Sequence, residues 1–237
     1  MNTPLRLSPI HNSLQPLNGT WRDINGMQSL VALPNDRHHI SQLGIADLSF
    51  LTRFGVKGAK AADWLASQGI AVPERPNTWH SLPEDGIIAR LGLTEFLIED
   101  SVSSSIAPNL AAACQSPPAK VYPVLRQDLA LVLMGDNPNG IPSDRINELL
   151  RQTCSFNFQA LSLSDRPVVL TSMIGVAVTV IPAERNGQPF YRIWCDGTFG
   201  TYFWQTLVEI ATELGGGAIG TESPMKNLPN PRQLGDL

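Results

Sequence analysis

The spacing of apolar residues along the chain predicts several helices. In the last third, large apolar side chains recur at intervals of four, four, three and four, which places a continuous stripe on one helix face. The stripe consists of Phe199, Phe203, Leu207, Ile210 and Leu214. The same period occurs over residues 59–66, before Gly69, a residue type that commonly ends helices. Further helices are expected at residues 103–114 and 143–153.

Short runs of β-branched and apolar residues, bounded by Gly, Pro and Asn, predict strands. The expected strands are residues 27–33, 45–56, 86–91, 94–99, 121–126, 129–134, 168–181 and 190–195. Gly92 between the third and fourth of these runs is typical of a hairpin, and Gly175 either divides or bends the run at 168–181. The order strand, helix, two strands, helix occurs twice. We therefore predict a duplicated α+β fold with helices packed on antiparallel sheets.

The distribution of turn-forming residues predicts the domain organisation. Residues 1–40 mix Pro, Asn, Ser and Gly with little periodicity, which is typical of an irregular arm with one short strand. The duplicated core is expected over residues 41–217, with halves at about 41–118 and 119–217. Residues 218–237 are rich in Gly, Pro and Asn, so we expect a flexible tail.

Composition changes this picture in one respect, because charged residues are scarce. They make up 16% of the 237 residues, against about 25% in a typical soluble protein. Scarce charge favours a surface that is partly covered by a partner. The net charge of −4 provides no general attraction to nucleic acid or anionic membranes, and the apolar runs are too short to cross a bilayer. Without a recognisable targeting segment, a cytoplasmic protein is expected.

Histidine and cysteine are the first candidates for catalysis and metal binding. The histidines are His11, His38, His39 and His80. None has a carboxylate or nucleophile at an informative spacing, so ordinary surface histidines are expected. The cysteines, Cys114, Cys154 and Cys195, lack the paired short spacing of a zinc or redox site and are expected to be buried and reduced. The end of a helix at Cys154 and the neighbouring Asp196 at Cys195 both disfavour a thiolate.

Acidic residues give no clearer signal of a catalytic site. The candidates are Asp47, Glu95, Glu99 and Asp100. Glu95 and Glu99 share one side of a predicted strand and lie about 13 Å apart, so we expect the last three acids to mark a solvated face. Gly215-Gly216-Gly217 follows a helix, which indicates a helix stop and not a phosphate-binding loop. The sequence thus predicts no catalytic residue and no metal ligand, and leaves any cofactor-binding residue unknown.

Two tryptophans fall in segments predicted to be irregular. Trp21 and Trp79 each carry a large ring that needs either the edge of a core or another protein. Both alternatives remain open at this point. Together with the low charge and the lack of a catalytic cluster, they favour a subunit of a larger assembly over a free enzyme.

Several blocks of sequence resemble the gamma subunit of heterotetrameric sarcosine oxidase, in the same order and over about residues 40–216. The blocks are Asp47-Leu48-Ser49-Phe50-Leu51-Thr52-Arg53-Phe54-Gly55-Val56-Lys57-Gly58, Ala61 to Leu65, Arg90-Leu91-Gly92, Thr94 to Asp100, Val121-Tyr122-Pro123-Val124-Leu125-Arg126-Gln127-Asp128, Gln152-Thr153-Cys154-Ser155 and Tyr191-Arg192-Ile193-Trp194-Cys195-Asp196. That family is similar in fold to the aminomethyltransferase, or T-protein, of the glycine cleavage system and to the folate-binding half of the large sarcosine oxidase subunit.

The resemblance implies a fold but carries over no catalytic or folate-binding residue. In the transferase, the corresponding segment carries Gly-Glu and Gly-Phe-Glu motifs. Here residues 171–177, Thr-Ser-Met-Ile-Gly-Val-Ala, contain no acid. A segment without a carboxylate lacks the group that would orient a pterin ring.

The function implied by the resemblance is that of a non-catalytic gamma subunit. The enzyme it resembles oxidises the N-methyl group of sarcosine and passes the one-carbon unit to tetrahydrofolate. FAD, FMN, NAD and tetrahydrofolate are then expected in partner subunits, with none bound by this chain, and the large subunit's folate-binding half is the expected neighbour. One alternative is the equivalent subunit of a related enzyme acting on N-methylglutamate. Another is a self-sufficient folate-binding transfer protein, which predicts a cleft with a buried acid between the two halves. A cleft filled by side chains such as Met173 and Trp194 would contradict this alternative.

Overall fold

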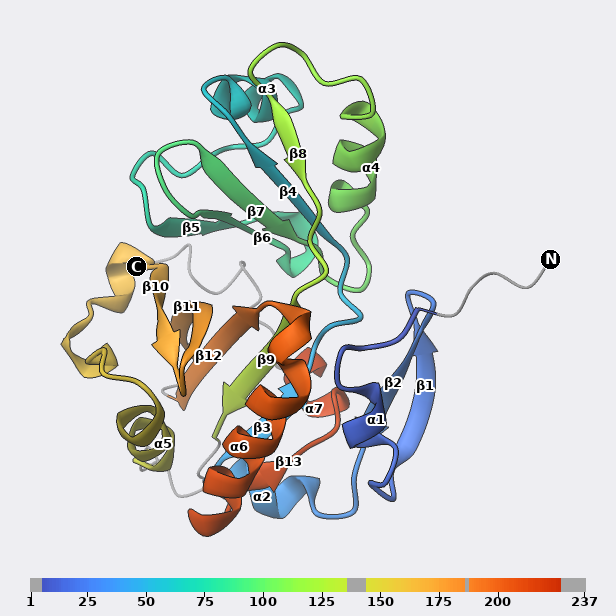
Figure 1. The fold of residues 1–237 in the computed structure, drawn as a ribbon, viewed down its shortest axis with the longest axis vertical. Helices are drawn as coiled ribbons and strands as arrows, with labels where there is room; N and C mark the ends of the chain where they lie inside the picture. The colour runs from blue at the N-terminus through green and yellow to red at the C-terminus, as the bar shows by residue number, and fades with distance from the viewer. Residues whose placement is uncertain (1–5, 136–143, 186–187, 227–237) are drawn as a thin grey trace. The chain divides into compact units, whose positions relative to one another are not determined.

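The computed structural model describes residues 6–135, 144–185 and 188–226 (Figure 1). These residues form two compact units that interleave along the chain. Unit 1 takes in the described parts of residues 1–50, 128–163 and 169–228, and unit 2 those of residues 51–127 and 164–168.

Unit 1 is built on a six-stranded sheet of order β10-β11-β12-β9-β3-β13. Its strands are β3 (Gly44–Asp47), β9 (Leu129–Met134), β10 (Val169–Met173), β11 (Val176–Arg185), β12 (Gln188–Cys195) and β13 (Gly217–Ala218). All neighbours are antiparallel except β13, which is parallel to β3. A separate antiparallel hairpin is formed by β1 (Thr20–Ile24) and β2 (Met27–Ala32).

The helices of unit 1 are α1 (His11–Leu14), α2 (Asp36–Gln42), α5 (Arg145–Thr153), α6 (Gly200–Glu213) and α7 (Glu222–Lys226), with 3-10 turns η2 (Phe158–Ala160), η3 (Leu163–Asp165, which ends in unit 2) and η4 (Gly197–Phe199). Side chains of three of these helices, α1, α5 and α6, pack in the unit 1 core against one face of the six-stranded sheet. On α6, Phe203 and Leu207 are fully buried in the core, as the predicted stripe requires. Phe199 instead ends the preceding turn and is 51% exposed, so the stripe begins one turn later than predicted.

Unit 2 contains a five-stranded antiparallel sheet of order β5-β6-β7-β4-β8. Its elements are β4 (Arg53–Lys57), α3 (Ala61–Ser67), β5 (Thr78–Ser81), η1 (Pro83–Asp85), β6 (Ile87–Arg90), β7 (Glu95–Glu99), α4 (Ile106–Ala113) and β8 (Tyr122–Val124). One sheet face packs against α3 and α4 through side chains that include Val56, Leu65, Phe96, Ile98 and Leu110. The other face carries the charged groups described below.

The α+β class is confirmed, with helices on antiparallel sheets. Each predicted strand and helix has a counterpart among the described residues, but two of the predicted strands are divided. The run at 45–56 is β3 and β4, which belong to different sheets, and the run at 168–181 is two strands joined at Ile174 and Gly175. The elements that were not predicted are α1, β1, α2, β5, β13 and α7. Most of these are short or polar. No residue of α2 is buried and only one residue of β1 is, so neither shows an apolar period in the sequence.

The domain organisation differs from the predicted arm and sequential halves. Ile10, Leu14 and Leu30 are buried in the unit 1 core, so most of the supposed arm is part of a folded unit. β3 pairs with β9 across more than eighty residues, which places the first 50 residues with the second half of the chain. For the described residues 6–50, this arrangement depends on long-range contacts that local sequence patterns do not report.

The described part of the C-terminal segment is ordered by close backbone contacts, unlike the flexible tail we predicted. A Cβ at Gly216 would lie 2.1 Å from the Leu43 carbonyl oxygen, and one at Gly220 would lie 2.2 Å from that of Val31. The Gly220 N–H donates to the Asp36 carboxylate at 2.9 Å. Gly215, with φ of +80°, ends α6 as expected, and the later glycines allow the chain to pass close to β2 and β3.

Candidate functional site

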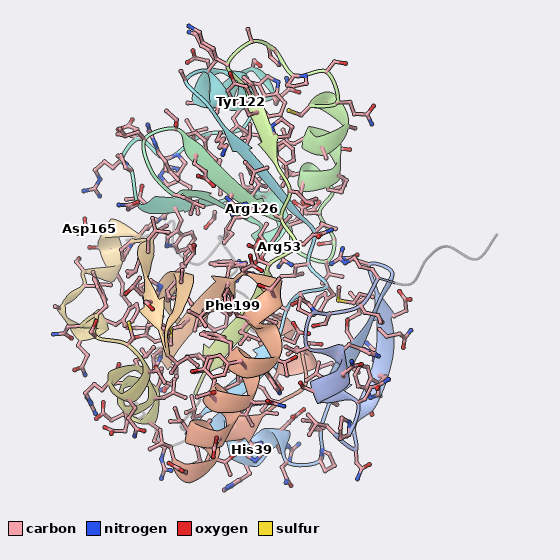
Figure 2. The ribbon with its side chains drawn as sticks, viewed as in Figure 1. His39, Arg53, Tyr122, Arg126, Asp165 and Phe199 are labelled. Carbon is pink, nitrogen blue, oxygen red and sulfur yellow. The ribbon has the colours of Figure 1, made fainter. Side chains whose placement is uncertain are left out.

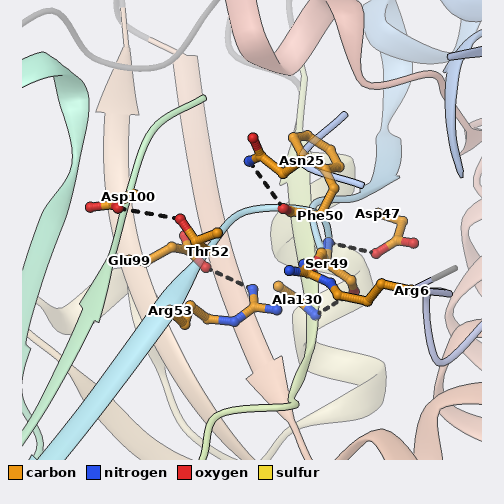
Figure 3. Close-up of polar contacts among 10 residues, drawn as sticks. All are labelled: Arg6, Asn25, Asp47, Ser49, Phe50, Thr52, Arg53, Glu99, Asp100 and Ala130. Atoms are coloured by element: carbon orange, nitrogen blue, oxygen red, sulfur yellow. Dashed lines mark hydrogen bonds and ion pairs between the residues drawn. The ribbon is translucent and has the colours of Figure 1, made fainter. Parts of the chain in front are cut away.

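A buried ion pair joins the central strand of the unit 2 sheet, β7, to its neighbour β4 on the face away from α3 and α4. Arg53 of β4 and Glu99 of β7 are cross-strand partners, and Arg53 Nη1 donates to Glu99 Oε2 at 3.0 Å (Figure 3). Their side chains are only 3% and 1% exposed. Burial at this level desolvates both charges, and the ion pair compensates part of that cost.

A second ion pair lies on the same sheet face, and its arginine was not singled out by the sequence. Arg126 Nη2 donates to Glu95 Oε1 at 2.6 Å, with side chains 14% and 39% exposed. A Cβ at Gly55 would lie 2.7 Å from Arg126 Nε, so the missing side chain lets the guanidinium lie across β4. Arg126 follows β8, and in Figure 2 it lies toward the opposite end of that strand from Tyr122. Strand register is needed to place it beside Glu95.

Asp100 anchors the start of α4. Its carboxylate accepts hydrogen bonds from Ala107 N at 2.9 Å, Ser104 Oγ at 3.0 Å and Thr52 Oγ1 at 3.2 Å. Asp100 is fully buried, and burial raises the pKa of its carboxyl above the ordinary value of 3.8. The prediction of a solvated face was wrong for Glu99 and Asp100, because Glu99 lies opposite Arg53 of β4 and Asp100, just after β7, is held at the start of α4.

We expect Asp100→Asn to remove a pH dependence of stability. Because the folded pKa is raised, the native state holds the proton more tightly than the unfolded chain does. The stabilisation is complete below pH 3.8 and is lost as the pH rises through the raised pKa. Urea unfolding of both proteins between pH 3.5 and 7 should therefore show wild type losing stability relative to the variant as pH rises. A difference that stays constant with pH would contradict this assignment.

Asp47 has a structural role in unit 1. It is 8% exposed and accepts a hydrogen bond from Ser49 N at 2.9 Å. The Ser49 hydroxyl accepts from Ala130 N at 3.1 Å, and Arg6 Nη2 donates to the Ser49 carbonyl at 2.6 Å (Figure 3). These contacts fix the chain after β3 against β9 and leave the Asp47 carboxylate buried, as expected of a structural group.

The four histidines do not gather at one site, although His38 and His39 are neighbours whose ring centroids lie 5.8 Å apart. His11 packs edge-on against Trp21 with ring centroids 5.5 Å apart, and His38 is exposed. His39 Nδ1 donates to the Ala218 carbonyl at 2.8 Å, which holds the C-terminal segment against α2. His80 is half-buried, and burial followed by the nearby Arg166 charge lowers the pKa of its imidazole. Only His38 fits the prediction of an ordinary surface residue without qualification.

The prediction of buried cysteines is confirmed, because Cys114, Cys154 and Cys195 are all free and buried. Burial raises the pKa of the Cys195 thiol to about 12, with Asp128 and Asp196 adding to the effect, and burial also raises that of Cys114. We expect none of the three thiols to react with Ellman's reagent at pH 7.5 in the folded protein, and all three to react in denaturant. Rapid reaction of one thiol in the folded protein would be evidence for an activated cysteine.

Both tryptophans from segments predicted to be irregular lie at core edges. Trp79 is 8% exposed in β5, and the Arg166 guanidinium lies 5.7 Å from its ring centroid. Trp21 is half-buried in β1 and packs against the unit 1 core. The structure therefore gives each ring a neighbour within its own unit.

A hollow of about 460 Å³ lies beside the C-terminal end of α5 in unit 1. It is lined by Asn147, Leu150, Arg151, Cys154, Ser155, Phe156, Asn157, Phe158 and Gln159. The Arg151 guanidinium forms ion pairs with Asp144 at 3.0 Å and Glu148 at 2.7 Å. The described lining is made of amide, hydroxyl, guanidinium, thiol, aliphatic and aromatic side chains, which suit contact with a polar or aromatic group.

The described residues lack the features of a metal site and of a membrane-spanning helix. They contain no cluster of three or more His, Cys, Asp or Glu side chains with the geometry of a metal site. Within the same residues, no helix is both long and apolar enough to cross a bilayer.

The two units together define the aminomethyltransferase-like fold. The chain is similar to the glycine cleavage system aminomethyltransferase T from Bartonella henselae, with a TM-score of 0.68 and 14% identity over 92% of this chain and 60% of that one. It is also similar to a chain of heterotetrameric sarcosine oxidase from Corynebacterium sp. U-96 in complex with pyrrole 2-carboxylate, with a TM-score of 0.60 and 17% identity over 90% of this chain and 98% of that one. No protein-family model and no curated protein sequence matches the chain.

Proposed function

We propose that this chain is a non-catalytic, gamma-type subunit of a heteromeric flavin-dependent oxidase of the sarcosine oxidase type. Such an assembly demethylates sarcosine to glycine and transfers the one-carbon unit to tetrahydrofolate. The observation that carries the proposal is the extent of the two structural likenesses. The chain matches a sarcosine oxidase chain over 98% of that chain's length, but it spans only 60% of the transferase.

The engagement of the buried acids supports a non-catalytic role. Glu99 is held by Arg53, and Asp100 accepts hydrogen bonds at the start of α4. Residues 171–177 correspond to the transferase segment that carries the acidic motifs. Here they form the β10–β11 turn and its flanking strand residues, with Met173 and Val176 in the unit 1 core. This segment offers no carboxylate to a pterin ring, so it does not fit folate.

The fold of this chain also does not fit a dinucleotide. The phosphate-binding turn of dinucleotide domains follows a parallel strand and opens a helix. Among the described strands only β3 and β13 are parallel, and the glycines at 215–217 follow α6. We therefore assign FAD, FMN, NAD and tetrahydrofolate to partner subunits, and the large subunit's folate-binding half is the proposed neighbour of this chain.

A self-sufficient folate-binding transfer protein is the second candidate. It is favoured by the higher TM-score to the transferase, 0.68 against 0.60. It requires the isolated chain to bind folate, whereas the subunit proposal places folate binding in another chain.

Expression of this chain with and without the proteins encoded beside its gene tests both candidates. We expect co-purification with flavin-bearing chains, and sarcosine oxidation dependent on tetrahydrofolate that requires this chain. Assays with N-methylglutamate in place of sarcosine distinguish the related enzyme. A monodisperse monomer that ignores the other chains would refute the subunit proposal, and tight tetrahydrofolate binding by that monomer, measured by calorimetry, would favour the transfer protein.

A further inference from the structure

Three segments of unit 2 form an exposed corner where the β6–β7 turn meets β4 and β8. Their residues are 57–60, 92–94 and 120–125, which we call the docking corner. Gly58 N donates to the Thr94 carbonyl at 3.0 Å, and Lys60 N donates to that of Lys120 at 3.2 Å. These bonds, and the pairing of β4 with β8, make the three segments one continuous surface.

The docking corner exposes large apolar side chains. Beside the β6–β7 turn, Leu93 is 76% exposed and Tyr122 is 55% exposed; Leu125, which is 79% exposed, lies three residues farther along the chain, toward the other end of β8. Leu125 and Leu93 have the highest exposure of any large apolar side chain among the described residues. Isolated exposed apolar residues are ordinary, but several on one continuous surface are typical of a protein interaction site.

The turn that presents Leu93 is held rigidly by Arg90. The Arg90 guanidinium donates to four carbonyl oxygens, those of Pro73, Glu74, Gly92 and Leu93, at 2.7 to 3.2 Å. It also lies 5.5 Å from the centroid of the Phe96 ring. A turn fixed in this way loses little conformational entropy when a partner binds, which favours a preformed contact.

β8 favours docking through side chains and not by extension of the sheet. Pro123 has no N–H to donate to an added strand, and proline at a sheet edge commonly prevents such pairing. A Cβ at Gly58 would lie 3.0 Å from Tyr122 Cδ2, so the Tyr122 ring lies against bare backbone. The ring is therefore supported in a position where one side remains exposed.

The charges around the docking corner indicate the chemistry of the partner. Lys57 and Lys120 are exposed, and within the described chain neither forms an ion pair. Lys60 pairs with Asp63 at 2.8 Å, and Glu95 pairs with Arg126, so the corner carries a local positive charge in a chain of net charge −4. A symmetric dimer through this surface would bring two positively charged patches together, which is repulsive.

We propose that the docking corner binds a different subunit. That subunit would offer an apolar socket, which Leu93 and Tyr122 fill, and carboxylates around the rim of the socket. This inference rests on the proposed function, because it names the surface by which this chain joins the assembly. Leu93 and Tyr122 supply the buried contact, and Lys57 and Lys120 supply the attraction to the acidic rim.

The test measures binding of purified Leu93→Asp to the co-purifying subunit that binds wild type. We expect the dissociation constant to rise at least about thirtyfold, because a charge would enter the apolar socket. Val102→Asp is the matched control. Val102 is 43% exposed beyond the opposite end of β7, and its variant should bind within about twofold of wild type. Circular dichroism melting of both variants verifies that each is folded.

Charge reversal at the two lysines of the docking corner provides an independent measurement. Lys57→Glu with Lys120→Glu should slow association at low salt, and this difference should shrink as salt is raised because exposed charges are screened. Folded Leu93→Asp that binds as wild type does would overturn the docking corner while leaving the subunit proposal intact. Failure of wild type to bind any co-encoded subunit would instead overturn both, as would a homodimer that Leu93→Asp dissociates.

Discussion

We expect Glu99→Gln to lower the free energy of unfolding by about 3 to 5 kcal/mol. The Arg53 and Glu99 side chains are 3% and 1% exposed, with a nitrogen–oxygen distance of 3.0 Å. Glutamine keeps the shape of the side chain but removes its negative charge, so the Arg53 guanidinium stays buried without the countercharge that compensates its lost hydration. Urea denaturation at pH 7, followed by circular dichroism, measures the loss.

The second ion pair of the same sheet provides the control. Glu95 is 39% exposed, so solvent screens its pairing with Arg126 and Glu95→Gln should cost about 0 to 1 kcal/mol. Replacing both members of the buried pair, as Arg53→Met with Glu99→Leu, should cost less than Glu99→Gln alone, because no uncompensated charge remains. Equal effects of Glu99→Gln and Glu95→Gln would contradict the importance we assign to burial.

The second large effect is expected at Gly220, where alanine should destabilise the protein by about 3 kcal/mol or more. Its added Cβ would lie 2.2 Å from the Val31 carbonyl oxygen and 2.4 Å from Ala32 Cα. Both neighbours are backbone atoms of the β2 region and cannot rotate away as a side chain could. Relief of the clash must therefore separate the C-terminal segment from β2, with loss of the bond from Thr221 N to the Leu30 carbonyl. Thermal and urea unfolding measure the change.

Gly92→Ala is the matched control for Gly220→Ala. No atom lies within 4 Å of a Cβ built at Gly92, so its replacement should change stability by less than about 0.5 kcal/mol. If Gly220→Ala were as stable as wild type, the C-terminal segment could not be packed against β2 as described.

Local patterns in the sequence were sufficient for most of the regular elements. The α6 stripe, the β6–β7 hairpin and the paired strands around Gly175 each follow from a period or a turn residue within about fifteen residues. The resemblance to sarcosine oxidase gamma subunits also led to the fold that the structural comparisons found. In these cases the signal and the structure both depend on neighbours along the chain.

The surroundings of the acids could not be predicted from the sequence, because they are set by pairing across strands. Glu95 and Glu99 look alike in the sequence, yet Glu99 lies opposite Arg53 and is buried while Glu95 remains partly exposed. Arg126 pairs with Glu95 because Gly55, which has no side chain, lets the guanidinium lie across β4. Charge burial depends on register, which the hydrophobic pattern of one strand does not specify.

The sequence by itself determined the α+β class, the positions of the main helices and strands, and the burial of the cysteines. The tertiary structure decided that residues 6–50 join the second half of the chain through β3 and β9. It also decided that residues 216–221 pack against β2 and β3, and that Leu93 and Tyr122 share one exposed surface. The physical reason is that secondary structure follows from interactions a few residues apart. Pairing of distant strands, burial of charge and the gathering of surface residues depend on contacts between segments that no local period encodes.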